Sequence, residues 1–230
     1  MADEGRQDEA ITWYERTLAL VPDHDLARRN LAILQAADAE RQADRLAAAG
    51  RTDEASDQYA RALALDPKRS HARAARGMLT MKRGRFREAV VELRAAIEGG
   101  VKDVEVANAL AFALVQNDET AEAASVLTRA AAEHPDNVNL MHNLARLLAT
   151  ASDPRVRDGE RAVRLALEVC ERTGNRDPRA LDTLSAAYAA EGRFDLAREA
   201  ASRAAARARE LGDAETAAAI DRRARSYARR

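Results

Sequence analysis

A phrase of about seventeen residues returns five times along this chain, and this internal repeat restricts the fold more than any other feature. The distance from Gly50 to Gly84 is 34 residues, and the distance from Gly84 to Asp118 is again 34. A fixed period of this length indicates a solenoid of small stacked modules. The five copies are GRQDEAITWYERTLALVP from Gly5, GRTDEASDQYARALALDP from Gly50, GRFREAVVELRAAIEGG from Gly84, DETAEAASVLTRAAAEHP from Asp118 and GRFDLAREAASRAAARA from Gly192.

Each copy has the composition of a turn followed by a helix. The Gly can adopt the left-handed conformation that ends a preceding helix. After a short turn comes an Ala, and a large side chain follows four residues later on the same helical face. The small residue lets a neighbouring helix approach, and the large one fills the space between modules. We therefore predict pairs of helices, with these positions in the core: Ala10/Tyr14, Ala55/Tyr59, Ala89/Leu93 and Ala123/Leu127.

The composition favours an all-α chain and excludes several classes of protein. Aromatic residues make up 3%, and only ten Gly and five Pro occur, which does not suit a turn-rich β-protein. Net charge is -1, so bulk charge gives no reason to expect nucleic acid as a partner. No apolar run is long enough to cross a membrane, so we expect no membrane insertion by this chain. The single Cys170 cannot form an internal disulfide and is predicted to be a buried thiol.

These repeats resemble the tetratricopeptide repeat family, in particular its bacterial members. The family unit is a helix-turn-helix of 34 residues with the pattern W-x2-L-G-x2-Y, then A-x3-F, then P. The second half of the pattern is well kept here. In the first half the Trp is absent, and other residues replace Leu-Gly. The resemblance implies a right-handed superhelical solenoid of antiparallel helix pairs with about 12 helices. The replacing pairs are Leu110-Ala111, Leu144-Ala145 and Leu184-Ser185.

The repeat period predicts the organisation of the chain, with two departures. The interval from Pro22 to Pro67 is 45, which is 34 plus 11, and the additional residues lengthen one helix over 23–49. This helix could form a packing or oligomer contact, or it could provide a projecting surface that binds a partner protein. The expected segments are a truncated first repeat with its second helix only (1–22), a repeat with the elongated first helix (23–67), repeats at 68–103 and 104–137, a repeat with an inserted loop at 150–160 (138–177), a repeat at 178–211 and a C-terminal capping helix (212–230).

No arrangement of side chains in the sequence has the pattern of a catalytic, metal or cofactor site. The four histidines are dispersed, and none is joined by a second ligand at the spacing that zinc sites use. No Ser or Cys has the context of a nucleophile elbow, and no glycine-rich phosphate loop occurs. We therefore expect a protein that is not an enzyme and that needs no cofactor and no metal.

The resemblance implies a concave groove lined mainly by the first helix of each pair. On each first helix, the residues on the side opposite the Leu-Ala (or Leu-Ser) pair include polar and apolar side chains that can bind a peptide. Asn143, Arg146 and Arg179 are the best candidates, since the first two are one helical turn apart and the third can face them from the next repeat. Family members that bind chaperone tails hold a terminal carboxylate with Lys, Asn and Arg. The expected groove residues are His71, Met78, Lys82, Glu105, Asn108, Phe112, Asn139, His142, Asn143, Arg146, Arg179, Asp182 and Thr183.

Three functions are compatible with the sequence. The first is a non-catalytic scaffold that binds a peptide or helical segment of another protein in the groove. The second is the repeat or regulatory portion of a larger envelope glycan- or lipid-modifying enzyme, with its catalytic domain outside this chain. The third, binding of nucleic acid, rests only on the abundance of Arg and is not expected. A homo-oligomer could form through exposed N-terminal helices. A cytoplasmic location is favoured, and an extracytoplasmic one remains open if the chain is a fragment.

Overall fold

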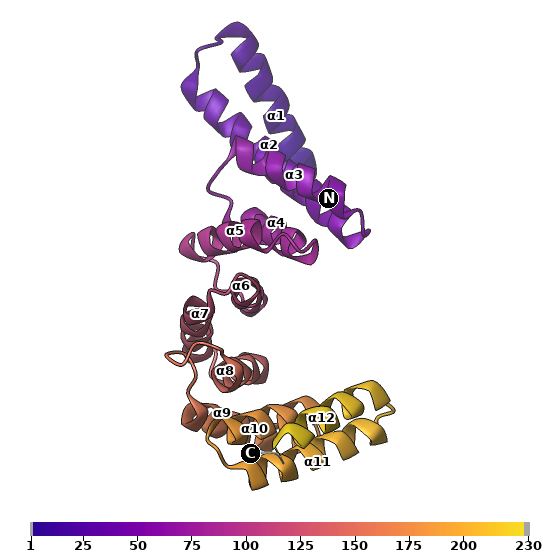
Figure 1. Ribbon diagram of the computed structural model, residues 1–230. Helices are drawn as coiled ribbons and strands as arrows, with labels where there is room; N and C mark the ends of the chain where they lie inside the picture. Colours follow the sequence, from indigo (N-terminus) through magenta and orange to yellow (C-terminus); the bar gives the residue numbers. More distant parts are fainter. Residues whose placement is uncertain (1, 228–230) are drawn as a thin grey trace. The chain divides into compact units, whose positions relative to one another are not determined.

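The computed structural model describes residues 2–227, and over this range the chain forms twelve α-helices and no β-strand (Figure 1). The prediction of an all-α fold with about 12 helices is confirmed. The chain divides into two compact units, residues 1–109 and 110–230.

The first unit is built from helices that pack in sequence order. Its helices α2 and α3 form one antiparallel pair, α4 and α5 form the next, and α1 packs on α2. The helix expected over 23–49 is α2, which has 24 residues, whereas α3 to α5 have 13 or 14. The bounds are α1 (Ala2–Leu20), α2 (Asp25–Ala48), α3 (Thr52–Leu65), α4 (Ser70–Lys82), α5 (Phe86–Glu98) and α6 (Val104–Gln116), which contains the division between the units.

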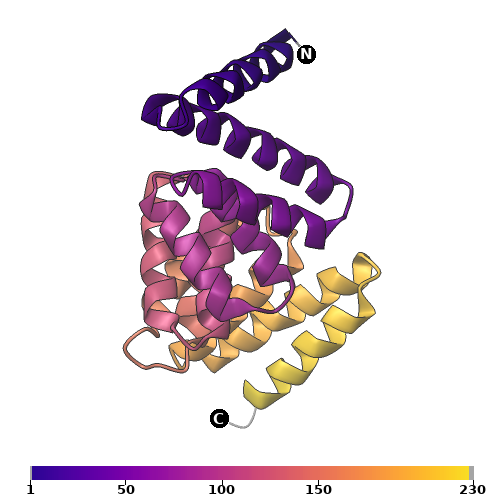
Figure 2. The ribbon, with the colours of Figure 1, turned by 90° about the horizontal axis from the view of Figure 1, so that it is seen from above.

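The second unit repeats the same arrangement. Helices α8 and α9 pack together, as do α10 and α11, and α8 also contacts α10. The last helix, α12, lies along α11, and Figure 2 shows these two yellow helices side by side. The bounds are α7 (Thr120–Glu133), α8 (Val138–Thr150), α9 (Gly159–Arg172), α10 (Pro178–Ala190), α11 (Phe194–Glu210) and α12 (Ala214–Tyr227).

The seam of small and large residues is the core of both units. The pairs Ala55/Tyr59, Ala89/Leu93 and Ala123/Leu127 are all buried, as predicted. In the pair Ala10/Tyr14 both residues are only partly buried. The reason is that α1 packs mainly against one helix of its unit, α2 (Figure 2).

Except between α8 and α9, the turn within each pair contains one residue with a positive φ. Gly84 has φ +74°, and its N–H donates to the carbonyl oxygen of Met81 at 2.9 Å, which closes α4. In the fourth copy of the phrase, Asp118 replaces the Gly and has φ +63°. Asp tolerates the left-handed region better than most residues, so the turn is kept.

A longer connection joins α8 to α9, where the repeat period predicted an inserted loop. Its course is fixed at both ends, because the Asp158 N–H donates to the carbonyl oxygen of Leu148 at 3.0 Å and the Asp158 side chain caps α9. Val156 is buried beneath the loop. The loop is therefore an ordered part of the second unit, with Arg155 held by Asp153 at its surface.

Candidate functional site

The predicted groove residues all lie on α4, α6, α8 and α10, the first helices of their pairs. On α4, His71 and Lys82 are exposed and Met78 is partly buried. On α6, Glu105 and Phe112 are exposed and Asn108 is partly buried. On α8, Asn139 and Arg146 are exposed, Asn143 is partly buried and His142 is buried. On α10, Arg179 is exposed, Asp182 is partly buried and Thr183 is buried.

Seven of these residues lie on two helices of the second unit that contact each other, α8 and α10. We call the surface formed by Asn139, Asn143, Arg146, Arg179 and Asp182 the α8–α10 face. His142 and Thr183, which are 6% and 3% exposed, lie beneath it and support it from the core side.

The start and the buried side of α8 orient its part of this face. The Asn137 side chain accepts a hydrogen bond from the Leu140 N–H at 3.0 Å and so caps the helix. Leu140 and Leu144 are buried on one side, which leaves Asn143 and Arg146 on the other side, three residues apart. Residues at this spacing lie one above the other on a helix, so an amide and a guanidinium are presented together.

The first turn of α10 is fixed in a similar way. Asp177 accepts a hydrogen bond from the Arg179 N–H at 2.8 Å, and Pro178 stands at the first helical position. Leu181 and Leu184 are buried, which turns Arg179 and Asp182 toward the surface. The polar side chains of α10 therefore lie within the first two turns of the helix.

The two arginines of the α8–α10 face have no carboxylate partner among the described residues. Within residues 2–227, neither Arg146 nor Arg179 forms an ion pair, whereas Arg164, Arg172 and Arg207, for example, each contact a carboxylate of a neighbouring helical turn. Two guanidinium groups without an anionic partner can each donate to a carboxylate of a ligand.

The buried His142 lies close enough to both arginines for their charges to affect its pKa. The pKa of His142 is lowered to about 4, mainly by burial; the charges of Arg179 and Arg146 act in the same direction, and Asp177 opposes them. The imidazole is therefore neutral at neutral pH. Arg146 and Arg179 therefore both place positive charge near the same imidazole, from two different helices.

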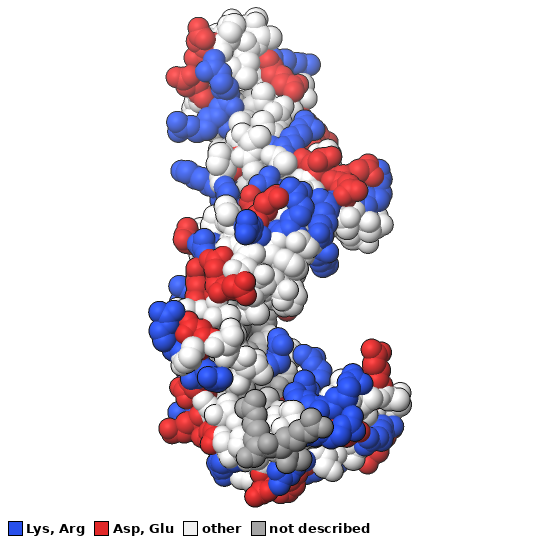
Figure 3. Space-filling model, in the orientation of Figure 1, with Lys and Arg blue, Asp and Glu red and all other residues white. Residues whose placement is uncertain are grey.

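One residue that contacts the α8–α10 face was not predicted from the sequence. Arg223 of α12 donates to both carboxylate oxygens of Asp182, at 2.6 and 2.5 Å. The ion pair neutralises the one acidic side chain of the α8–α10 face. Figure 3 shows basic side chains gathered over α12 in this unit. The arginines of residues 221–230 could have indicated a cationic helix, but no sequence signal names Asp182 as the partner of Arg223.

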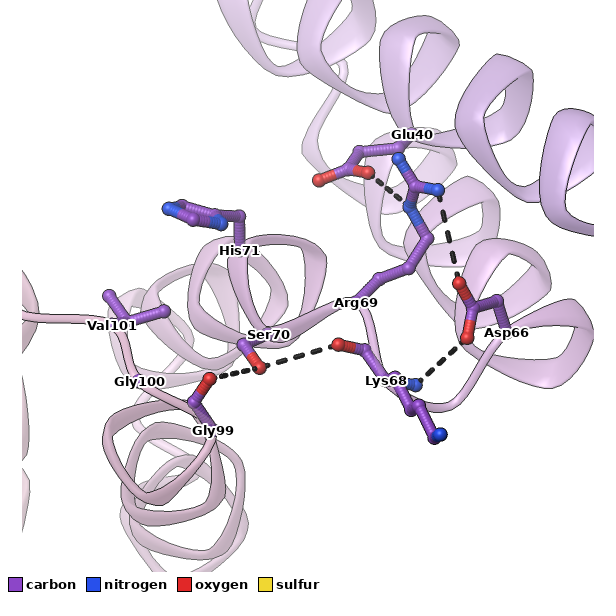
Figure 4. Close-up of a pocket in the computed structure, with 9 residues that line it drawn as sticks. All are labelled: Glu40, Asp66, Lys68, Arg69, Ser70, His71, Gly99, Gly100 and Val101. Atoms are coloured by element: carbon purple, nitrogen blue, oxygen red, sulfur yellow. Dashed lines mark hydrogen bonds and ion pairs between the residues drawn. The ribbon is translucent and has the colours of Figure 1, made fainter.

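The first unit contains a pocket of about 420 Å³ where α2, α3, α4 and the segment after α5 meet (Figure 4). Of the predicted groove residues only His71 lines it, and the sequence did not indicate the rest. Arg69 is held between Glu40 and Asp66, and the Ser70 hydroxyl donates to the carbonyl oxygen of Gly99 at 3.1 Å. Most polar groups of the pocket therefore bind one another. The pocket is best explained as part of the packing between adjacent helix pairs, and not as a ligand site. The lining residues are Glu40, Asp66, Lys68, Arg69, Ser70, His71, Gly99, Gly100 and Val101.

The part of the chain that the structure describes contains neither a metal-binding cluster nor a membrane-spanning helix. No group of three or more His, Cys, Asp or Glu side chains within residues 2–227 is arranged to hold a metal ion. Over the same range, every helix is too short or too polar to cross a bilayer.

Comparisons with known proteins agree with this architecture. Two family profiles, both described as tetratricopeptide repeat, match residues 46–111 and 104–147. No curated protein matches the chain in sequence.

Solved structures of three proteins have a similar fold. YrrB, described as a tetratricopeptide protein with an unusual peptide-binding site, is 17% identical, with a TM-score of 0.65 over 89% of this chain and 96% of its own. MamA is 18% identical, with a TM-score of 0.66 over 77% and 94%. A thermophilic tetratricopeptide protein of Thermus thermophilus, TTC0263, is 19% identical, with a TM-score of 0.55 over 80% and 98%. At these identities the likeness shows the fold alone.

Proposed function

Because the chain is a tetratricopeptide repeat protein, we propose that it is a non-catalytic scaffold that binds an anionic peptide segment of a partner protein on the α8–α10 face. The observation that carries this proposal is the pair of arginines without ion pairs, Arg146 and Arg179, on two helices that contact each other. The coarser function, interaction with another protein, is what this repeat fold suggests.

Each part of the face has a task in the proposed complex. The Asn139 and Asn143 amides carry both donors and acceptors, so they can bind the backbone of an extended peptide. Arg146 and Arg179 each offer a planar fork of donors that fits a carboxylate in a bidentate manner. The Asp182 carboxylate would repel such a ligand, and its ion pair with Arg223 removes most of that repulsion.

The solvent exposure of the two arginines favours reversible binding. Both side chains are exposed, so a ligand carboxylate replaces water and retains part of its hydration. Each charge-assisted contact then contributes about 1.5 kcal/mol, which corresponds to about tenfold in affinity. We expect a complex whose affinity falls as the salt concentration rises.

The proposal is tested by cross-linking and affinity purification from the source cell with two variants of equal charge. R146A/R179A removes the two arginines of the face. R129A/R157A removes two exposed arginines of the same unit that lie on α7 and on the loop after α8 and that also form no ion pair within residues 2–227. A partner that is retained by R129A/R157A and lost by R146A/R179A supports the proposal. A partner that both variants retain contradicts it.

A further inference from the structure

The large apolar side chains that remain exposed are concentrated at the N-terminal end of the first unit. Of the nine such side chains among the described residues, five lie between residues 13 and 33, including Trp13 at 65% exposed, Leu20 at 85% and Leu26 at 62%. The other four are dispersed, three on separate helices and Leu211 just after α11, and exposed apolar residues that are scattered singly are normal in proteins. A cluster of them is typical of an interaction surface.

Comparison of two repeat copies shows what kind of element would cover this surface. Alignment of the phrase from Gly5 with the phrase from Gly50 places Trp13 at the position of Gln58 and Leu20 at that of Leu65. Gln58 and Leu65 are both partly buried, and α3 packs against α2, the first helix of its own pair, as well as against α4. On α1 the same positions are exposed, so the open face is one that a helix would cover.

The exposed side chains of α1 form a single stripe along the helix. Glu9, Trp13, Arg16 and Leu20 follow at spacings of four, three and four residues, and all four are exposed. This spacing keeps them on one side of a helix. The Arg16 guanidinium lies over the Trp13 ring at 5.5 Å. Neither Glu9 nor Arg16 forms an ion pair with any described residue, so both charges are available to a partner.

We infer that this α1 stripe is an interface with a second copy of the same chain, in which the two α1 helices pack antiparallel about a two-fold axis. In such an antiparallel pair, the numbers of any two residues that lie level with each other add up to the same sum, and this sum defines the register. The register that sets Glu9 level with Arg16 of the second copy also sets Arg16 level with Glu9 of the second copy. A two-fold interface forms every contact twice, so two ion pairs result.

The same register brings Trp13 to the axis. It sets Trp13 within one residue of Trp13 of the second copy, a displacement of about 1.5 Å along the helix. Each ring, now exposed, is then covered by the other, while the two ion pairs flank them. The α1 stripe is therefore complementary to itself in both charge and apolar area. For this reason we infer that a second copy of the chain, and not an unrelated protein, covers it. The inference concerns the first unit and does not depend on ligand binding at the α8–α10 face.

A charge exchange tests the inference directly, with sedimentation velocity as the measurement. E9R places two cations level with each other in the proposed register, and R16E does the same with two carboxylates, so each single variant is expected to weaken the dimer at least tenfold. E9R/R16E restores opposite charges and is expected to restore the dimer. R87E, which reverses the charge of an exposed arginine on α5, is the matched control and is expected to leave the dimer unchanged. A double variant that stays as weak as the singles overturns the inference.

Fluorescence supplies an independent measurement, because Trp13 is the only tryptophan of the chain. Emission is expected to shift to longer wavelength as the protein is diluted and the dimer dissociates. W13A/L20A is expected to be monomeric with unchanged helical circular dichroism, whereas V91A, which truncates an exposed apolar residue on α5, stays dimeric. An unaltered chain that is monomeric throughout the concentration range, or a dimer that W13A/L20A leaves intact, overturns the inference.

Discussion

Arg223 Nη2 of α12 lies 2.5 Å from Asp182 Oδ2 of α10, and this ion pair joins residues that are 41 positions apart in the chain. Its side chains are 45% and 26% exposed, so its direct contribution to stability is small, about 0.5 kcal/mol. Its consequence for the α8–α10 face is larger, because Asp182 stands three residues after Arg179 on the same helix. Without Arg223, the carboxylate would compete with a ligand for the Arg179 guanidinium.

The first prediction concerns this ion pair and ligand affinity. R223A is expected to weaken the binding of an acidic peptide about threefold, and D182N is expected to strengthen it by a similar factor. Fluorescence anisotropy with a labelled peptide measures both. R225A is the control, since Arg225 is an exposed arginine of α12 that forms no ion pair within residues 2–227. Equal effects of R223A and R225A would mean that only net charge matters.

The second prediction follows from the lowered pKa of His142, which is about 4 in the folded protein. A free histidine has a pKa of about 6.5, so the unfolded chain takes up a proton as pH falls below that value, while the folded protein does not until pH 4. The stabilising effect of the neutral buried ring is therefore complete above pH 7 and is lost as pH falls from 6.5 toward 4. From pH 7 to pH 5 we expect a loss of about 2 kcal/mol from this residue alone.

Urea denaturation of the wild type and of H142N at both pH values measures this loss. Carboxylates titrate equally in the two proteins, so the difference between their pH dependences isolates His142. A pH dependence that H142N leaves unaltered would contradict the assignment. NMR titration adds a second readout: an anionic peptide bound beside Arg146 and Arg179 is expected to raise the pKa of His142, because it offsets their charges.

The third prediction concerns the reactivity of the single cysteine. Cys170 is 2% exposed, and burial raises the pKa of its thiol to about 11. Since the thiolate is the reactive form, the folded protein is expected to react with Ellman's reagent at pH 8 far more slowly than the same protein in urea. Fast labelling of the folded protein would show that α9 opens readily. C170A is the control for labelling of other groups.

The fourth prediction concerns a hydrogen bond between α2 and α3. The Tyr59 hydroxyl donates to Asp44 Oδ1 at 2.5 Å, and burial together with this bond raises the pKa of Tyr59, so the phenol remains a donor. Y59F is expected to lower the free energy of unfolding by about 1.5 kcal/mol in chemical denaturation. Y188F is the control, because the Tyr188 hydroxyl makes no hydrogen bond with a described residue. Similar losses in both variants would show that removal of a hydroxyl group, and not loss of the hydrogen bond to Asp44, lowers the stability.

The repeat period was sufficient to predict the fold. Ala55, Tyr59, Ala89 and Leu93 could be placed in the core because the helix period of 3.6 residues and the repeat of 34 residues agree at those positions. Asp118 shows the same point for the turns, since its place in the repeat predicted a turn although the usual Gly is missing.

The candidate site could be predicted only in part. Helical spacing placed Asn143 and Arg146 on one face, yet it also selected His142 and Thr183, which the structure buries. The spacing defines a sector of the helix, and the contact between α8 and α10 decides how much of that sector remains exposed. Likewise, the absence of ion pairs at Arg146 and Arg179 within the described residues and the pairing of Asp182 with Arg223 depend on which helices meet in space, and no local pattern contains that information.

Anisotropy titration of one labelled acidic peptide against two variants tests the binding account most directly. The peptide carries a free C-terminal carboxylate, and the proteins are the wild type, R146A/R179A and R129A/R157A. We predict that the wild type and R129A/R157A bind with similar affinity and that R146A/R179A binds about a hundredfold more weakly, since each arginine contributes about tenfold. Equal binding by all three proteins, or no binding by the wild type at low salt, would contradict the account.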